Sequence, residues 1–409
     1  MQNIILLLIT SFIYSQKLII PMDQSQNNHL KAYGVVYSIL NKSINVEWLL
    51  NYKGGSFLVD SYPFIEAECK IKGVTYSYIN SSQILEIYSI IDQNNMNITL
   101  LEKKPNIAIY TPPNKQPWDD AVTLALTYAE VEYETLWDEE VHLGKLDEYD
   151  WLHLHHEDFT GQYGKFYRSY RNAAWYMQQQ KDAEERAKNL GFNKVSELKL
   201  GVAKRIKEFT AGGGFLFTMC SGTDSFDISL AAEETDICDY MFDGDPADPS
   251  AQSKLNYSRS LAFKDFKLKS NPMEYEFSDI DGTTLHRIPE SQDLFTLFEF
   301  SAKWDIVPTL LCQNHTRVIK GFMGQTTDFL NSKIKSNVLV MGECKSLGTA
   351  RYIHGEFGKG QWTFYGGHDP EDYRHYVNDP PTDLNLYPNS PGYRLILNNI
   401  LFPAAKKKK

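Results

Sequence analysis

Three of the ten histidines in the chain fall within four consecutive positions, directly before two acidic residues. This segment contains His153, His155, His156, Glu157 and Asp158. The run 149–154 alternates as a β-strand does, so the acidic pair follows where that strand should end. Ligands of open α/β sheets bind outside the carboxyl ends of the strands. The segment is therefore placed for proton transfer or metal ligation, whereas the structural alternative makes His153 a core residue and the acidic pair a helix start.

A thiol follows a second strand-like run. Residues 215–219 are predicted to form a buried strand, and Cys220, Ser221 and Gly222 come directly after it. This order is typical of a nucleophile elbow, in which a sharp turn exposes the side chain and the following amides stabilise an oxyanion. A thiol near a helix amino terminus also loses its proton more easily. We therefore expect Cys220 to be a nucleophile, and an inert buried cysteine is the alternative.

A third segment places an imidazole beside carboxylates just past another predicted strand. His368 precedes Asp369 and Glu371 there. In a thiol mechanism, His368 is the base that serves Cys220, and one of the two carboxylates orients the imidazole. The loop after Asp158 is expected to form the opposite wall of the cleft, and Glu157 is a further candidate catalytic residue.

Two other interpretations use the same residues differently. In a metal-assisted hydrolase, the site binds a divalent ion such as zinc, and Cys220 is structural. The ligands are then His155, His156, Glu157 and His368. In a non-catalytic alternative, the protein is an envelope module that binds carbohydrate or protein and keeps only the fold. The thiol interpretation needs no cofactor.

Strand and helix patterns alternate twice along the chain, which predicts parallel, doubly wound α/β sheets. The first set opens with a buried strand at 17–23, and the second opens with a strand at 106–111. The segment 103–105, Lys-Lys-Pro, separates the two sets. We therefore expect a smaller N-terminal α/β domain over 17–104 and a larger domain over 105–405.

Two further segments have uneven composition. The stretch 178–189 is highly polar with helical spacing, which indicates a surface insertion. The acidic run 242–248 offers oxygen ligands for calcium, but its spacing is not that of an EF-hand and favours an ordinary acidic loop. Aromatic residues before the polar stretch would line a sugar cleft or, as the alternative, pack in the core. They are Tyr167, Tyr170, Trp175 and Tyr176.

The two ends of the sequence predict processing and solvation. The apolar run within 4–14 is too short to span a bilayer and precedes a small residue, Ser15. We expect residues 1–16 to be a signal peptide and the protein to be exported, either periplasmic or secreted. No later run of about 18 apolar residues predicts a transmembrane segment. The basic residues 406–409 are expected to form a solvated tail.

Composition narrows the classes of partner. The net charge of −11 argues against a nucleic-acid binder. We expect a small-molecule or carbohydrate substrate, and the sequence leaves the oligomeric state open. Five cysteines are few for 409 residues and odd in number, so they predict no disulfide framework.

The order of these motifs resembles the class I glutamine amidotransferase-like superfamily, and within it the trehalose-utilisation (ThuA-like) branch. The resemblance rests on Cys220-Ser-Gly222 and on Gly367-His368-Asp369 with Glu371, and it is extended by segments 357–362 and 391–399. Thr218 stands where the family has glycine. The resemblance covers roughly 106–405. It implies a flavodoxin-like, doubly wound parallel sheet and hydrolysis or transfer at an amide, an ester or a sugar-derived substrate.

Over its full length the chain is similar to exported bacterial proteins that often carry the label "asparagine synthetase B". A synthetase of that kind needs a cysteine at the mature amino terminus and a Ser-Gly-Gly-x-Asp-Ser nucleotide loop. The sequence contains neither, and it has no Walker loop or dinucleotide glycine motif in their place. We therefore expect no ATP-dependent asparagine synthetase activity.

Overall fold

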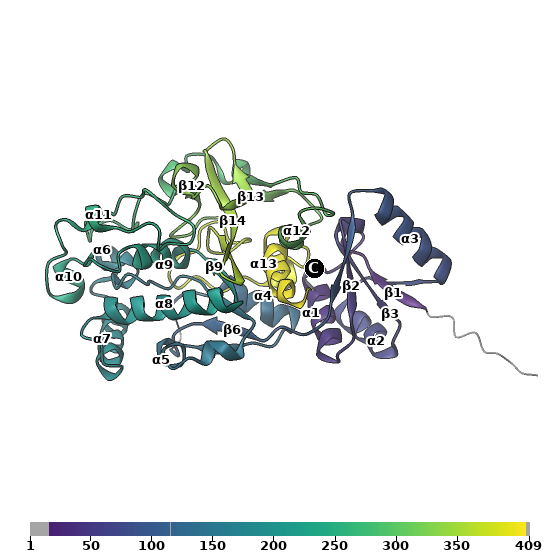
Figure 1. Ribbon diagram of the computed structural model, residues 1–409, viewed down its shortest axis with the longest axis horizontal. Coiled ribbons are helices and arrows are strands. Elements are labelled where there is room, and N and C mark those ends of the chain that lie inside the picture. The colour runs from purple at the N-terminus through teal and green to yellow at the C-terminus, as the bar shows by residue number, and fades with distance from the viewer. Residues whose placement is uncertain (1–15, 115, 406–409) are drawn as a thin grey trace, which may run out of the picture.

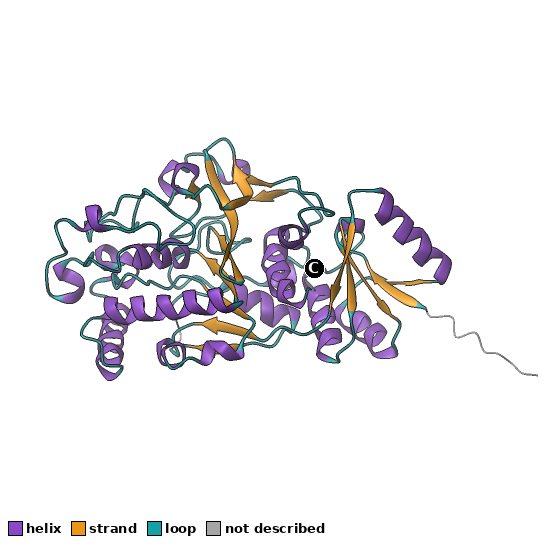
Figure 2. Ribbon diagram, viewed as in Figure 1, coloured by secondary structure: helices purple, strands orange, loops and turns teal. Residues whose placement is uncertain are grey.

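The computed structural model describes residues 16–114 and 116–405, which form two β-sheets with helices between and around them (Figures 1 and 2). The predicted basic tail, and all of the predicted signal peptide except Gln16, lie outside the described residues. The chain passes from the first sheet to the second between Leu101 and Ile107.

The N-terminal sheet has five strands in the order β4-β1-β3-β2-β5, and every neighbouring pair is antiparallel. The strands are β1 (Lys17–Ile20), β2 (Val46–Leu50), β3 (Ser56–Asp60), β4 (Ser77–Ile79) and β5 (Asn97–Leu101). The expectation of a parallel sheet in this half is wrong. The link 51–55 contains four residues with positive φ, Asn51, Lys53, Gly54 and Gly55, and it folds β2 and β3 into an adjacent pair. Strands joined by such a short link pair antiparallel.

The second sheet has ten strands in a mixed arrangement. Its parallel part, in the order β7-β6-β8-β9-β15, consists of β6 (Ile107–Tyr110), β7 (Glu134–Leu136), β8 (Trp151–Leu154), β9 (Phe215–Met219) and β15 (Gly360–Tyr365). An antiparallel part extends it through β10 (Leu294–Leu297), β11 (Val318–Lys320), β12 (Phe329–Leu330), β13 (Leu339–Cys344) and β14 (Thr349–Phe357). This part of the chain therefore has an α/β fold, but its sheet is not purely parallel.

A tight hairpin joins the two parts of this sheet. Gly358 has a φ of +62°, and a Cβ at Gly360 would lie 2.1 Å from the carbonyl oxygen of Thr210. Glycine is needed at both positions, because other residues are strained or excluded there. The hairpin reverses the chain, so β14 runs antiparallel to β15 and starts the antiparallel part.

Helices pack on both sheets, and helices after residue 120 cover both faces of the second sheet. The helices are α1 (His29–Asn41), α2 (Pro63–Lys72), α3 (Ser81–Gln93), α4 (Ala121–Ala129), α5 (Asp138–His142), α6 (Tyr167–Tyr170), α7 (Ala174–Asn189), α8 (Val195–Gly212), α9 (Ser221–Ala231), α10 (Tyr240–Asp243), α11 (Ala251–Lys254), α12 (Ile306–Leu311) and α13 (Pro391–Leu401). Helices α4 and α13 pack on the face with Ile107 and Ile109, and α5, α8 and α9 pack on the face with Ala108 and Tyr110. Alternate residues of one strand thus enter two separate cores.

The two sheets share one hydrophobic core through α1, α4 and α13, which lie between them in Figure 1. A Cβ on Gly34 of α1 would lie 1.7 Å from the carbonyl oxygen of Ala129, so glycine permits the close approach of α1 to α4. The buried Arg394 of α13 donates to the carbonyl oxygens of Met22 and Gly54 at 2.8 Å and 2.5 Å. These contacts fix the N-terminal domain on the larger one.

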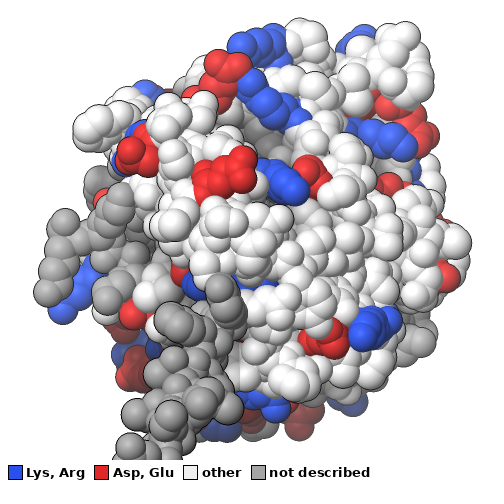
Figure 3. Space-filling view, turned by 90° about the vertical axis from the view of Figure 1, so that its right-hand side faces the viewer, with Lys and Arg blue, Asp and Glu red and all other residues white. Residues whose placement is uncertain are grey.

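Among the described residues, no helix has both the length and the apolar character needed to cross a membrane. On the face that the N-terminal domain presents, acidic and basic side chains of the described residues are interspersed (Figure 3).

Candidate functional site

Cys220 lies in a sharp turn between β9 and α9. Its φ of +50° and ψ of −141° are rare for a residue with a side chain. Two residues later, the N–H of Gly222 donates to the carbonyl oxygen of His155 at 2.7 Å, and a Cβ there would lie 2.2 Å from that oxygen. The small residue therefore allows the start of α9 to touch the end of β8. This contact brings the thiol and the histidine segment to one edge of the sheet.

His368 reaches the thiol from the loop after β15. Gly367, with a φ of +95°, turns the chain, and the His368 N–H donates to the carbonyl oxygen of Met323 at 3.0 Å. The imidazole lies beside the Cys220 thiol, and both side chains line the same cavity. On its other side, His368 Nε2 lies 3.4 Å from Oδ1 of Asp119. The three side chains form a cysteine–histidine–aspartate chain.

The electrostatics around Cys220, His368 and Asp119 favour a thiolate–imidazolium pair. Burial opposes the charged form of Cys220, but His368 and the backbone amides of residues 325 and 326 outweigh burial and lower the pKa of the thiol. Burial likewise opposes a charged His368, but Asp119 and Cys220 raise the pKa of His368 to about 10. The N–H of Gln325 donates to Sγ at 3.3 Å. The sulfur is thus surrounded by groups that stabilise negative charge.

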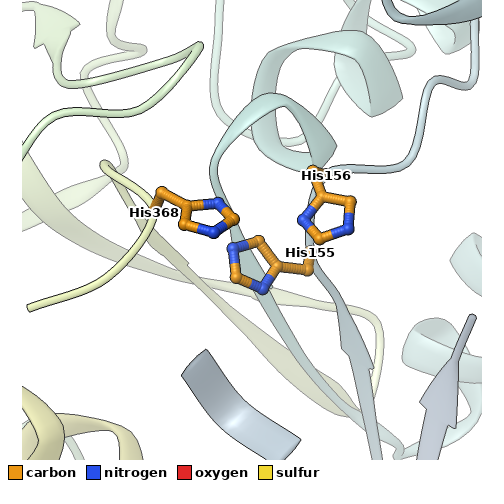
Figure 4. Close-up of side chains that lie close together, drawn as sticks. All are labelled: His155, His156 and His368. Carbon is orange, nitrogen blue, oxygen red and sulfur yellow. The ribbon is translucent and has the colours of Figure 1, made fainter. Parts of the chain in front are cut away.

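His155 and His156 lie at the end of β8 beside His368 (Figure 4). Their ring centroids are 4.6 Å and 5.5 Å from that of His368, and each of the three residues offers a ring nitrogen within 4.8 Å of the others. Nε2 of His155 and Nδ1 of His156 are buried without a hydrogen-bond partner among the described residues. Burial lowers the pKa of His155 to about 4. Neutral imidazoles with free nitrogens are the form that ligates metals.

Two adjacent carboxylates stand behind these rings. Oδ2 of Asp120 lies 3.3 Å from His153 Nε2 and 3.3 Å from His155 Nδ1. Oδ1 of Asp119 lies 3.1 Å from Nε2 of His375, in addition to its contact with His368. Two further groups could therefore hold an ion. They are Asp120 with His153 and His155, and Asp119 with His368 and His375.

Three predicted site residues lie elsewhere. Asp369 is buried, and it accepts hydrogen bonds from the Tyr393 hydroxyl at 2.7 Å and from the Glu371 N–H at 2.8 Å. Glu371 hydrogen-bonds with Ser390. The carboxylate that contacts His368 is that of Asp119, and not that of Asp369 or Glu371. Glu157 borders a neighbouring cavity and does not belong to the group of potential metal ligands formed by His155, His156 and His368. The predicted set of four ligands is therefore reduced to these three histidines.

The sequence argument missed Asp119, Asp120, His375 and Gln325. The two aspartates follow β6, a strand whose carboxyl end shares the edge with those of β8 and β9. That shared edge was the available signal. Cys220, His156, His368, His375 and the loop with Gln325 line a cavity of about 570 Å³.

No protein-family model matches the chain, and no curated protein matches it. Among solved structures, the cytoplasmic proteins STM3548 and STM1381 from Salmonella typhimurium are 11% and 10% identical to it, with TM-scores of 0.36 and 0.35. Each alignment covers 74% of this chain and 100% of the other. A GH42 β-galactosidase from Bacillus circulans aligns with 65% of this chain and 29% of its own, at 11% identity and a TM-score of 0.26. Scores this low carry no argument about function.

Proposed function

We propose that this chain is a cysteine-dependent hydrolase or acyl transferase that acts on an amide, ester or sugar-derived carbonyl substrate. The observation that carries the proposal is Cys220, held at an elbow with positive φ, in one cavity with His368, whose imidazole contacts Asp119. A nucleophile, its base and an orienting carboxylate in that order are the arrangement of nucleophilic catalysis.

The residues imply an order of steps. The Cys220 thiolate attacks the carbonyl carbon, and the electron pair of the C=O bond moves to oxygen. The N–H of Gln325, beside the sulfur, is the candidate donor to that oxyanion. The imidazolium of His368 gives its proton to the leaving amine or alcohol as the bond to carbon breaks. His368 then takes a proton from water as the water oxygen attacks the carbonyl carbon of the thioester. The C–S bond breaks, which releases the acid and restores the thiolate–imidazolium pair.

The wider assignment is part of the same proposal. The parallel strands follow the sequential order 2-1-3-4-5, with β6 as the first, which is the flavodoxin-like order. This order and the elbow support membership in the class I glutamine amidotransferase-like superfamily. Export remains a prediction. The mass of the mature protein tests it, because an intact Met1 would contradict cleavage of the signal peptide.

Selective alkylation tests the nucleophile. Metal-free native protein is treated with iodoacetamide near neutral pH, and the labelled cysteine is located by mass spectrometry. We expect Cys220 to react first, because burial raises the pKa of Cys69 to about 12 and that of Cys238 well above its usual value. His368→Ala should slow labelling without unfolding the protein, and Cys238→Ser should leave it unchanged. An unreactive Cys220 would overturn the proposal and favour a non-catalytic binding module.

A metal-assisted hydrolase is the second candidate, because the free nitrogens of His155 and His156 converge beside His368. Zinc held by three protein ligands supplies Lewis-acid chemistry and keeps an open position. Metal analysis of the purified protein and thermal unfolding with added zinc test this candidate. Bound zinc that raises the Tm and slows alkylation of Cys220 supports it, and a Tm indifferent to zinc and chelator excludes it.

A further inference from the structure

A second cavity, of about 610 Å³, adjoins the Cys220 cavity. The two cavities share Trp118, His156 and Phe166 as lining residues. Its volume lies within the range of about 300–1,000 Å³ typical of small-molecule sites. We propose that this cavity is a saccharide-binding subsite, which holds the sugar portion of the substrate whose carbonyl group reaches Cys220. The inference rests on the proposed function for the link to Cys220, but the subsite itself is tested by binding alone.

The walls of the cavity are aromatic. Trp118 meets Trp175 edge to face, with ring centroids 5.5 Å apart, and meets Phe166 at 5.4 Å. Trp137 borders the cavity as well. The indole N–H groups of Trp118 and Trp137 are buried and have no acceptor among the described residues. A pyranose has apolar C–H faces that pack on such aromatic rings.

The polar residues of the cavity suit a neutral polyol. The cations that border it are occupied, because Lys199 pairs with Asp138 at 2.9 Å and Arg186 lies 4.0 Å from the same carboxylate. The carboxylate of Glu157 takes part in no hydrogen bond or ion pair in the described part of the chain. An anionic ligand would therefore find no free cation, whereas hydroxyl groups would find the carboxyl group of Glu157 as a hydrogen-bond partner.

Helix α7 supplies the opposite wall. Gln178 Nε2 donates to Asp182 Oδ1 at 2.7 Å, and Gln179 Nε2 donates to Gln116 Oε1 at 2.5 Å. These amides and carboxylates keep further donors and acceptors for a ligand. The polar stretch that the sequence identified as a surface insertion thus has a role as the polar wall of this cavity, and Trp175 precedes it on the same helix.

The test uses the full chain with Cys220→Ser, so that binding is measured without turnover. Glucose, galactose, N-acetylglucosamine and maltose are the probes, with choline and inorganic phosphate as charged controls. We expect at least one saccharide to raise the Tm and change the tryptophan fluorescence. Trp175→Ala should weaken that binding at least about twofold, because an aromatic contact contributes roughly 0.5–1.5 kcal/mol beyond its area. Trp304→Ala, at an 87% exposed position outside the cavity, should leave it unchanged.

Gln178→Ala, on the exposed side of α7, is the second variant and should also weaken binding. The inference is overturned if no saccharide binds, if only choline or phosphate binds, or if binding survives in both cavity variants. Iodoacetamide labelling of the wild type separates the two proposals. If Cys220 is labelled but no saccharide binds, the subsite is rejected and the nucleophile stands. If a saccharide binds but Cys220 is unreactive, the nucleophile is rejected and the subsite stands.

Discussion

Asp119 decides how strongly the Cys220 thiol ionises, because it touches His368 on the side away from the sulfur. Asp119→Asn removes the charge that, with Cys220, raises the pKa of His368 to about 10 against the effect of burial. A less positive imidazole stabilises the thiolate less, so the pKa of Cys220 should rise. Each unit of that rise corresponds to about 1.4 kcal/mol and lowers the thiolate fraction below the pKa about tenfold.

Thiolate absorbance as a function of pH and the alkylation rate at neutral pH measure the effect. Asp372→Asn is the matched control, because Asp372 pairs with His375 at 2.9 Å and leaves the Asp119–His368 contact intact. Equal thiolate titrations in the two variants would show that Asp119 does not orient the base.

Gly222 determines whether the elbow forms at all. Gly222→Ala places a Cβ 2.2 Å from the carbonyl oxygen of His155, where backbone and not a flexible side chain must move. We expect a loss of about 1–3 kcal/mol in the free energy of unfolding, the usual cost of overpacking, together with slower labelling of Cys220. Urea denaturation measures the loss.

Gly212→Ala is the control for this substitution, because a Cβ there meets nothing within 4 Å. It should leave stability unchanged or raise it by up to about 1 kcal/mol through helix propensity. Similar effects of the two substitutions would contradict the steric explanation.

At the scale of elements, β14 fixes the loop that touches the sulfur. Arg351 of β14 donates to the carbonyl oxygen of Phe322 at 2.8 Å and pairs with the buried Asp293 at 2.8 Å. Arg351→Met leaves the buried Asp293 with His286, 3.4 Å away, as its remaining positive partner. Breaking a buried pair costs about 3–5 kcal/mol, and His286 should reduce that loss. We expect that loss in denaturant unfolding, with slower alkylation of Cys220 as the loop loses its anchor.

Lys204→Met is the corresponding surface control. Lys204 pairs with Glu233 at 2.7 Å, but its side chain is 48% exposed. Exposed pairs contribute about 0–1 kcal/mol, so the change should be small. A comparable loss in both variants would indicate a general effect of removing charge.

The sequence identified the ends of β8, β9 and β15 because the signals there are local. A buried run followed at once by histidine or cysteine needs no knowledge of distant contacts. Asp120 shows why other residues were missed. Its Oδ1 caps α4 by accepting from the N–H groups of Val122 and Thr123, while its Oδ2 faces His153 and His155. Capping fully explains an aspartate before a helix, so its second role became visible only in three dimensions.

The sequence predicted the hairpin of 351–356 and 361–365, which β14 and β15 form, but the shorter antiparallel strands could not be predicted. Strands β10, β11 and β12 are short, and long loops separate them. In strands of that length, pairing across the sheet decides the structure more than the alternation of side chains does. The same holds for the N-terminal domain, where alternation of strand and helix was correct but the direction of pairing depended on the turn at 51–55.

At the scale of the whole molecule, the contact between the two domains contains buried histidines that resist protonation. His29 of α1 stacks on His315 at 4.1 Å, and Nη1 of Arg394 lies 3.3 Å from Nδ1 of His315. Burial and Arg394 lower the pKa of His29 to about 4. Burial, His29 and Arg394 lower the pKa of His315 to about 3. Protonation would place stacked cations beside a guanidinium.

These shifts predict that acid weakens the junction between the domains. Between about pH 6.5 and pH 4 the unfolded chain binds protons at both histidines while the native protein does not, so the free energy of unfolding falls as the pH falls. His315→Phe keeps a ring stacked on His29 and removes one of the two histidines that bind a proton in acid. The variant therefore has one positive charge fewer beside Arg394 at low pH. The variant should therefore lose less stability than the wild type between neutral pH and pH 5 in urea unfolding. Equal losses in the two proteins would show that acid acts elsewhere in the molecule.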